Sequence, residues 1–304
     1  GRLVLLFGAG ASRGSKNTLG NDIPLGRELA EILAKEISEP YDGESLADVY
    51  AAARSVLGNQ VNAILDKNFK HCTPSSEYIE LLKYPFFRIY TLNIDDAFEK
   101  AAHRSSTVKL NVKQRTDMVS EIDQFYETLD YIKLNGDVSR NDIGFIFSAQ
   151  EYAAGSASEP LWYAELARDF HRFTFLFIGT SLKEPLFNHQ VEKYKSQTNS
   201  SDLKSYILLP SLSSIEQKSL SVNNIEYLQG TLGDFTKWLS SEFPIPPSSV
   251  DIVANTRPEL KLEKVLSGRS LSFFIGVTPV NRSTLSLMKN GSTQSVIRNF
   301  YKGF

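Results

Sequence analysis

The chain has 304 residues, of which 41% are hydrophobic and 22% charged, as in globular proteins large enough for a substantial core. Its net charge of -2 gives no general attraction to nucleic acid, and a run of about 18 apolar residues, as a membrane span needs, is absent from the sequence. The single cysteine, Cys72, excludes an internal disulfide and a four-cysteine zinc site, so we expect a cytoplasmic protein.

Five short apolar runs, separated by segments with helical spacing, predict the fold. The runs are LVLLF (3–7), FFRIYTLN (86–93), YIKLNG (131–136), FTFLFIGTS (173–181) and SYILLP (205–210). Helical patterns between them include LGRELAEILAKEI and PLWYAELARDFHRF. Strands that alternate with helices favour an α/β, Rossmann-like doubly wound fold with a mostly parallel sheet.

Two further stretches predict the domain organisation. Residues 41–83 have apolar positions three and four residues apart, which predicts a helical insertion between the first two strands. The Pro- and Ser-rich stretch PIPPSSVD predicts a boundary near 243–250. We therefore assign residues 1–243 to one domain and residues 244–304 to a linker and the start of a following region, a short C-terminal extension in which PELKLEKVLS is predicted as a helix and SLSFFIG as a strand.

The segment FGAGAS places Gly8 and Gly10 directly after the first strand. Without side chains, these positions let backbone N–H groups approach a pyrophosphate. The third glycine of G-x-G-x-x-G would fall at Arg13, and Gly14 is not followed by the Lys-Ser or Lys-Thr of a P-loop. An NAD-dependent oxidoreductase and a kinase are therefore disfavoured, and a tight turn without a ligand is the alternative.

Four more polar segments follow in order along the chain. They are IPLGREL, TLNIDD, KLNGD and IGTSLKEP, and the last three come at the ends of predicted strands. Because the carboxyl ends of parallel strands meet at one edge of a sheet, these segments should converge on a single crevice with the glycine turn.

This ordered set resembles the sirtuin superfamily, in which a Gly-Ala-Gly turn, a Pro-x-x-Arg loop and Thr-x-Asn-x-Asp, Lys-Leu-His-Gly and Gly-Thr-Ser segments surround NAD. The resemblance spans roughly residues 3–240. It implies that the first domain binds NAD as a substrate, without a metal. The implied NAD-binding residues are Gly8, Ala9, Gly10, Ser12, Pro24, Arg27, Thr91, Gly179, Thr180 and Ser181.

Departures from the sirtuin pattern indicate the branch of the superfamily. Sirtuin deacylases carry a zinc ribbon of two cysteine pairs, which a chain with one cysteine lacks, so deacylation is not expected. The helical insertion, the TLNIDD form and the C-terminal extension look like those of the defence-associated sirtuin-like proteins of bacteria. This resemblance implies an antiphage NAD+ hydrolase that depletes NAD on infection, assembles as a tetramer or larger, and responds to a phage protein or a partner defence subunit.

The resemblance also implies catalytic roles. Asn93 would position the attacking water and the ribose hydroxyls, with a helix cap as its alternative role, and Asp95 would hold the carboxamide or the loop. Asn135 stands where the family has its catalytic His, whose near-neutral pKa lets it accept a proton. An amide cannot accept that proton, so we expect NAD binding with slow turnover, and we favour an engineered replacement over a natural Asn135. The alternative function is an inactive module that senses NAD or ADP-ribose and controls assembly of a larger complex.

Several side chains have a structural interpretation beside the functional one. Arg27 can reach a phosphate or form a surface pair with Glu31 on the same helix. The segment from Gly179 to Ser181 can contact the ribose or phosphates, or cap a helix. We interpret His171 as a partly buried helix residue, and the aromatic residues of the apolar runs as core.

Overall fold

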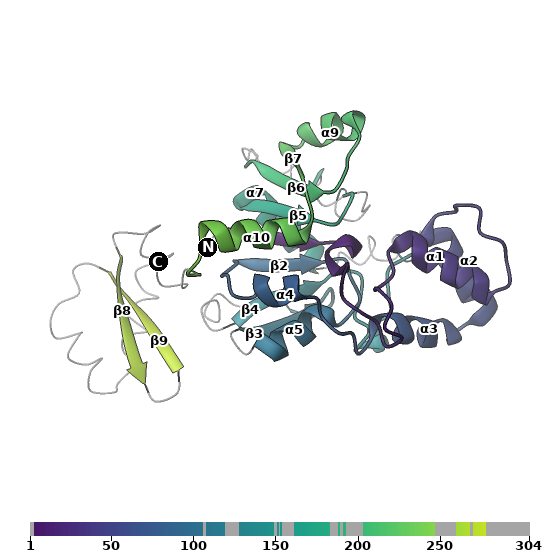
Figure 1. Ribbon diagram of the computed structural model, residues 1–304, viewed down its shortest axis with the longest axis horizontal. Coiled ribbons are helices and arrows are strands. Elements are labelled where there is room, and N and C mark those ends of the chain that lie inside the picture. Colours follow the sequence, from purple (N-terminus) through teal and green to yellow (C-terminus); the bar gives the residue numbers. More distant parts are fainter. Residues whose placement is uncertain are drawn as a thin grey trace. The chain divides into compact units, whose positions relative to one another are not determined.

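The computed structural model describes residues 3–105, 108–118, 128–148, 151, 153, 161–182, 188, 191–192, 203–246, 260–267 and 270–277. Seven strands form one sheet in the order β3-β4-β2-β1-β5-β6-β7, and every neighbouring pair is parallel (Figure 1). The strands are β1 (Leu3–Phe7), β2 (Arg88–Thr91), β3 (Lys109–Gln114), β4 (Thr128–Lys133), β5 (Thr174–Ile178), β6 (Ser205–Leu209) and β7 (Ile225–Gln229). The predicted Rossmann-like α/β fold is confirmed.

The two strands that the apolar runs do not predict, β3 and β7, lie at the edges of the sheet. Their sequences, KLNVKQ and IEYLQ, mix polar and apolar residues, and most of their side chains are half-buried or exposed. An edge strand pairs on one side only and is covered less completely, so it does not need a continuous apolar run.

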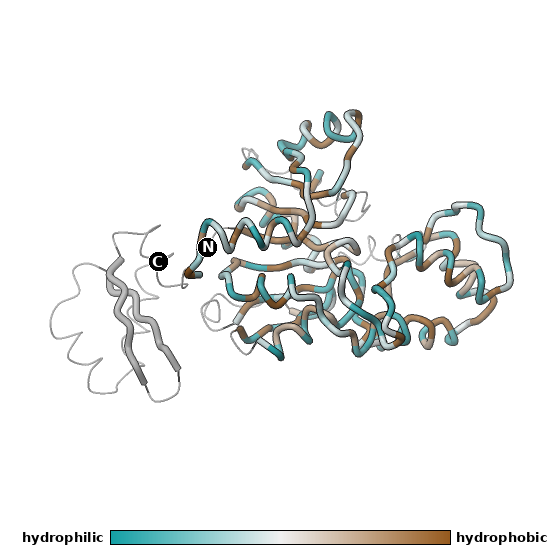
Figure 2. The backbone as a smooth tube through the Cα atoms, in the orientation of Figure 1, coloured by the Kyte–Doolittle hydropathy of each residue, from teal (hydrophilic) through white to brown (hydrophobic). Residues whose placement is uncertain are grey.

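Helices cover both faces of the sheet, as alternate side chains of β1 show. Leu5 and Phe7 join a hydrophobic cluster with α4 (Ser76–Leu81), α5 (Ala97–Ser105) and α10 (Leu232–Glu242). Val4 and Leu6 point to the other face and pack with α7 (Leu161–Arg172), while α9 (Ser214–Ser221) contributes a half-buried leucine there. Figure 2 shows the resulting hydrophobic strands between helices that carry hydrophilic residues.

The chain between β1 and β2 adds a group of helices that Figure 1 shows to one side of the sheet. They are α1 (Gly26–Glu36), α2 (Leu46–Leu57) and α3 (Gln60–Phe69), and α4 follows before β2. The predicted helical insertion of residues 41–83 is divided into separate helices, and α2 is followed by Gly58, which has a φ of 55°. Glycine adopts this left-handed conformation without steric cost.

The described structure divides into two compact units, one formed by residues 2–244 and the other containing residues 245–304. In the second unit, β8 (Leu260–Ser267) pairs antiparallel with β9 (Ser270–Val277). The strand predicted at SLSFFIG is thus confirmed, but the helix predicted at PELKLEKVLS is wrong. Leu260 and Leu262 alternate with polar residues, and this period of two suits a strand once a partner follows directly in the chain. Much of the predicted linker, from residue 247 on, lies outside the described residues.

Across the described parts of the chain, none of the helices combines the length and the apolar character that crossing a bilayer requires.

Candidate functional site

The carboxyl ends of β1 and β5 meet near the centre of the sheet. The connection after β1 leads to β2 on one side, and the chain later crosses back to β5 on the other side. In open parallel sheets, ligands bind outside such a switch point. The glycine turn after β1 and the Gly-Thr-Ser segment after β5 both lie there, so the structure brings the first and the last predicted motifs together.

Three glycines let these two loops touch backbone to backbone. The amide of Gly10 donates to the carbonyl oxygen of Gly179 over 3.0 Å. A Cβ on Gly8 would lie 2.6 Å from that same oxygen, and a Cβ on Gly179 would lie 2.3 Å from the backbone nitrogen of Ala11. Gly179 also has a φ of 67°. Packing between the loops therefore accounts for the glycines even without a ligand.

The side chain of Asn93 is held in one orientation by the loop after β1. Its Nδ2 donates to the carbonyl oxygen of Gly8 over 3.0 Å and to Oγ of Ser12 over 2.9 Å. A carbonyl oxygen can only accept, so the bond to Gly8 determines which end of the amide is Nδ2. In the described part of the chain Oδ1 has no hydrogen bond, which leaves it as an acceptor at the site. Asn93 does not act as the helix cap that was its alternative role.

Beneath Asn93, the hydroxyl of Ser12 connects three side chains. It donates to Oδ2 of Asp95 over 2.8 Å and lies 3.0 Å from the hydroxyl of Tyr78. Since its single proton goes to Asp95, Tyr78 is the donor in the second bond. Ser12 is 1% exposed and its hydrogen-bonding capacity is used, so it orients Asn93 from below.

Asp95 is buried and holds the loop after β2. Its Oδ1 accepts from the backbone nitrogen of Ala97, the first residue of α5, over 3.0 Å. Burial raises the pKa of this carboxyl, against the opposing effects of the Lys133 ammonium and the Ser12 hydrogen bond. Of the two roles considered for Asp95, the structure shows the contact with the loop.

Asn135 follows β4, the strand next to β2. The backbone nitrogen of Leu134 donates to the carbonyl oxygen of Thr91 over 2.9 Å, which places Asn135 on the strand end beside that of Asn93. Its Oδ1 accepts from the hydroxyl of Tyr163 on α7 over 2.7 Å. This bond uses one of the two lone pairs of Oδ1, so Asn135 can offer a ligand the donor Nδ2 and the second lone pair of Oδ1.

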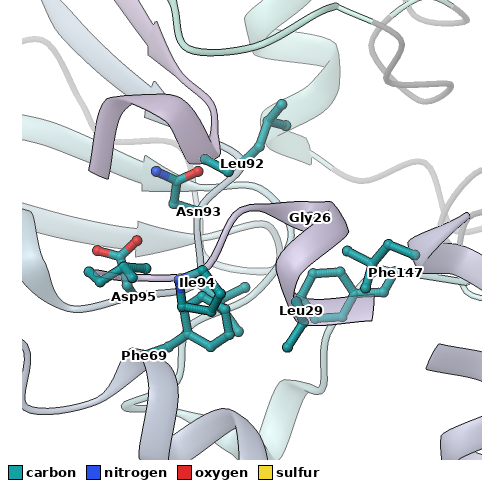
Figure 3. A pocket seen from close by; sticks show the side chains of 12 residues that line it. Gly26, Leu29, Phe69, Leu92, Asn93, Ile94, Asp95 and Phe147 are labelled. Atoms are coloured by element: carbon teal, nitrogen blue, oxygen red, sulfur yellow. The ribbon is translucent and has the colours of Figure 1, made fainter. Parts of the chain in front are cut away.

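A cavity opens beside Asn93 and Asp95 (Figure 3). The space inside it that water can occupy is about 60 Å³, which is below the size range of small-molecule sites. Figure 3 shows Asn93 and Asp95 on one side of the cavity and Leu29 with Phe147 on the other. The remaining lining is mostly apolar and comes from Ala9, Ile23, Pro24, Gly26, Leu46, Phe69, Leu92 and Ile94. The lining thus combines a mostly apolar surface with the polar side chains of Asn93 and Asp95.

The other predicted residues lie outside the cavity lining. Thr91 is buried, and its hydroxyl accepts from the backbone nitrogen of Asn93 over 3.0 Å. Thr180 is buried at the end of β5 and accepts from the backbone nitrogen of Leu182, whereas Ser181 is exposed.

Arg27 forms the surface pair with Glu31 that was considered beside a phosphate contact. Its Nε lies 3.2 Å from Glu31 on the same face of α1, and its side chain is 78% exposed. His171 is buried on α7, as interpreted from the sequence. Within the described ranges, no three side chains of the His, Cys, Asp or Glu type are grouped so as to hold a metal ion.

Three residues that support the site were not predicted from the sequence. Tyr78 and Tyr163 hold the hydroxyl of Ser12 and the amide of Asn135, and both occur in apolar helical patterns that indicate only core packing. Lys133, whose ammonium contacts the carbonyl oxygen of Asp95, did leave a signal, because it is the one charged residue in the apolar run YIKLNG. A lysine in a strand covered on both faces needs buried partners.

Residues 88–228 match the family model of the SIR2-like domain. The match begins with β2, ends within β7 and covers less than half of the chain. It includes the segments of Asn93, Asn135 and Gly179 but not the glycine turn after β1. It supports a sirtuin-like domain with an NAD-related function. A comparison with curated proteins gives no match.

Proposed function

We propose that the chain binds NAD and that its parent activity is hydrolysis of NAD+ to nicotinamide and ADP-ribose. The observation that carries this proposal is the hydrogen-bonded contact of the loop after β1 with Asn93 and Asp95, both of which line one cavity, while Asn135 follows the neighbouring strand β4. Nicotinamide is a flat ring with a carboxamide, and a largely apolar cavity with an amide and a carboxylate at one side suits it.

The chemistry requires orientation more than acid catalysis. In hydrolysis, the bond from the ribose C1′ to the nicotinamide nitrogen breaks and its electron pair goes to the ring, which leaves as a neutral molecule. The oxygen of water then bonds to C1′ and releases one proton. Asn93 Oδ1 is held where it can accept a hydrogen bond from a ribose hydroxyl or from this water, and a fixed position of the nucleophile lowers the barrier.

Asn135 limits the rate that this arrangement can reach, because it cannot act as a general base. A histidine could take a proton from the ribose or from water, whereas Nδ2 of Asn135 only donates. The loss of a general base costs about 10²- to 10⁴-fold in rate, while hydrogen bonds for binding remain. The proposed parent activity is therefore largely silent in this sequence, and NAD binding persists.

Replacement of Asn135 by His tests the function. We expect Asn135→His to raise nicotinamide release from NAD by about 10²- to 10⁴-fold, measured by chromatography. The variant Asn135→Gln, which introduces no base, is the matched control and should give no gain. If neither protein binds NAD in calorimetry, the proposed function is wrong.

A second candidate is a module that senses NAD or ADP-ribose. The hydrogen bond from Tyr163 to Asn135 favours it, because the amide is held by the fold as a permanent part of the site. Retained NAD binding without nicotinamide release from Asn135→His would support this candidate over the hydrolase.

The biological setting that we propose is antiphage defence, in which a homo-oligomer of four or more chains is activated by a phage protein or a partner defence subunit and depletes NAD. The resemblance of the helical insertion and of the TLNIDD segment supports this setting. Cellular NAD in infected bacteria that carry Asn135→His, compared with bacteria that carry the chain unchanged, is the measurement that tests it. Light scattering of the purified protein tests the assembly.

A further inference from the structure

Lys133, the last residue of β4, is completely buried and ends among three oxygen atoms. Its Nζ lies 2.7 Å from the carbonyl oxygen of Asp95, 2.7 Å from Oε1 of Glu99 and 3.0 Å from Oδ1 of Asp137. An ammonium group has three donors and no acceptor, so these three contacts satisfy it completely.

The three oxygen atoms belong to different parts of the chain. Asp95 lies in the loop after β2, two residues beyond Asn93, and Asp137 lies in the loop after β4, two residues beyond Asn135. Glu99 lies in the first turn of α5. One ammonium group therefore connects both loops that carry the proposed reacting side chains, and it connects them to a helix.

The two loops also touch through their backbones. The nitrogen of Val138 donates to the carbonyl oxygen of Ile94 over 3.0 Å. The second loop is itself closed by Asp137, whose Oδ1 accepts from the nitrogen of Ser139 over 2.9 Å. Lys133 thus contacts two loops that are also joined by one backbone hydrogen bond.

The electrostatics keep Lys133 charged. Burial alone would lower the pKa of the ammonium, but the carboxylates of Glu99 and Asp137 outweigh burial and raise the pKa. A buried charge depends on its partners far more than an exposed one does. Lys83, by contrast, forms a surface pair with Glu80 in which the lysine side chain is 47% exposed, and such pairs contribute little.

We propose that Lys133 is a positioning residue that holds the loops after β2 and β4 at the spacing at which Asn93 and Asn135 reach the same ligand. It contacts these loops and not the ligand. The proposal rests on the proposed function for the ligand, but the spacing of the loops can be measured without one.

Amide hydrogen exchange of the full chain tests the positioning. In Lys133→Met we expect amides of residues 93–97 and 134–139 to exchange about tenfold faster or more, while β5 and β6 keep their protection. Lys83→Met, which removes a lysine from a surface pair, is the control and should leave both loops unchanged. Unchanged exchange in both loops of Lys133→Met, or a uniform increase that includes β5 and β6, would overturn the proposal.

A second variant separates positioning from charge balance and covers the case in which Lys133→Met does not fold. The double variant Lys133→Met/Glu99→Leu removes one of the two carboxylates that the first change leaves without their cation, and the other, Asp137, keeps its hydrogen bond from the nitrogen of Ser139. If Lys133 only balances charge, the double variant should recover both the stability and the loop protection of the parent. If Lys133 positions the loops, stability recovers and loop protection does not.

An activity measurement extends the test to the reaction. In the Asn135→His background, Lys133→Met should lower kcat for nicotinamide release by about 10- to 100-fold and change KM by less than about threefold, because misplaced groups affect the transition state most. Equal kcat values with and without Lys133 would overturn the positioning role. If Asn135→His itself releases no nicotinamide, the proposed hydrolase is wrong, and the exchange experiment still decides the role of Lys133.

Discussion

At the scale of single residues, the site depends on buried polar groups that hold one another. Asn93 is oriented by Gly8 and Ser12, and Ser12 is in turn held by Asp95 and Tyr78. Every bond of this group is between chain segments far apart in the sequence. A shift of the loop after β1 would therefore also move the side-chain amide of Asn93, which we propose to orient water.

Removal of the Ser12 hydroxyl should destabilise the fold and the site together. Ser12→Ala leaves Asn93, Asp95 and Tyr78 each short of one buried partner, so we expect the free energy of unfolding to fall by about 1–3 kcal/mol in urea titrations. Ser76→Ala removes an exposed hydroxyl that contacts Glu77 and should change it by less than about 0.5 kcal/mol. Equal values for the two variants would contradict the network.

Glu99 should make stability depend on pH. Burial raises its pKa from an ordinary 4.5 to about 7, despite the opposing effect of Lys133. Between these values the folded chain binds more protons than the unfolded chain, so this residue makes stability fall as pH rises from about 4.5 to about 7, with no further change above.

The variant Glu99→Gln removes this titration. Urea titrations at several pH values should give a stability that falls less steeply between pH 5 and 7, roughly, than that of the parent, because Gln carries no ionisable proton. All other ionisable groups are common to the two proteins, so the difference between the two curves isolates Glu99. A difference curve that is flat over this range would show that the pKa of Glu99 is not raised.

At the scale of elements, the ends of β1 and β5 are brought together by glycine, and the first turn after β1 packs on Gly179. The close approach leaves no room for a side chain at either strand end. Both loops must therefore move together if one of them is altered.

Two alanine substitutions distinguish the stability cost of disturbing the contact between the loops from the cost of backbone strain alone. Both glycines have a positive φ, 67° at Gly179 and 55° at Gly58. A Cβ added to Gly179 would lie 2.3 Å from the backbone nitrogen of Ala11, whereas a Cβ added to Gly58 would have no neighbour within 4 Å. Gly58→Ala should cost about 1–3 kcal/mol from the positive φ alone. Gly179→Ala should cost about 1–3 kcal/mol more, measured by thermal unfolding, because the loop after β1 must shift. Equal costs would mean that the two loops separate easily.

At the scale of the whole molecule, the sheet, both hydrophobic clusters and the candidate site belong to the unit of residues 2–244. A unit that contains its own core can fold by itself. The β8–β9 hairpin belongs to the other unit.

A shortened chain of residues 1–244 should therefore unfold in one cooperative transition and keep the NAD affinity of the full chain within about threefold. Calorimetry of unfolding and of NAD binding measures both. A shortened chain that lacks a cooperative transition would show that residues 245–304 complete the core of the first unit.

The elements that could be predicted from sequence are those with a strong local pattern. All five apolar runs became strands, since a central parallel strand is covered on both faces and must be apolar along its length. The edge strands β3 and β7 lack this pattern. The segment after Pro258 was wrongly predicted as a helix because a few apolar positions fit both periods, and the neighbouring strand determined the outcome.

The alternation of apolar runs with helical patterns was sufficient to predict an α/β fold, and the polar motifs after the strands indicated a site at the strand ends, because parallel strands direct their carboxyl ends to one edge. The partners of individual side chains required the folded chain. Tyr78, Lys133 and Tyr163 acquire their roles through hydrogen bonds across 28 to 66 positions of sequence, and Arg27 turned to Glu31 on the helix surface. Local periodicity encodes which face of an element is buried, whereas the meeting of distant polar atoms depends on how the elements pack.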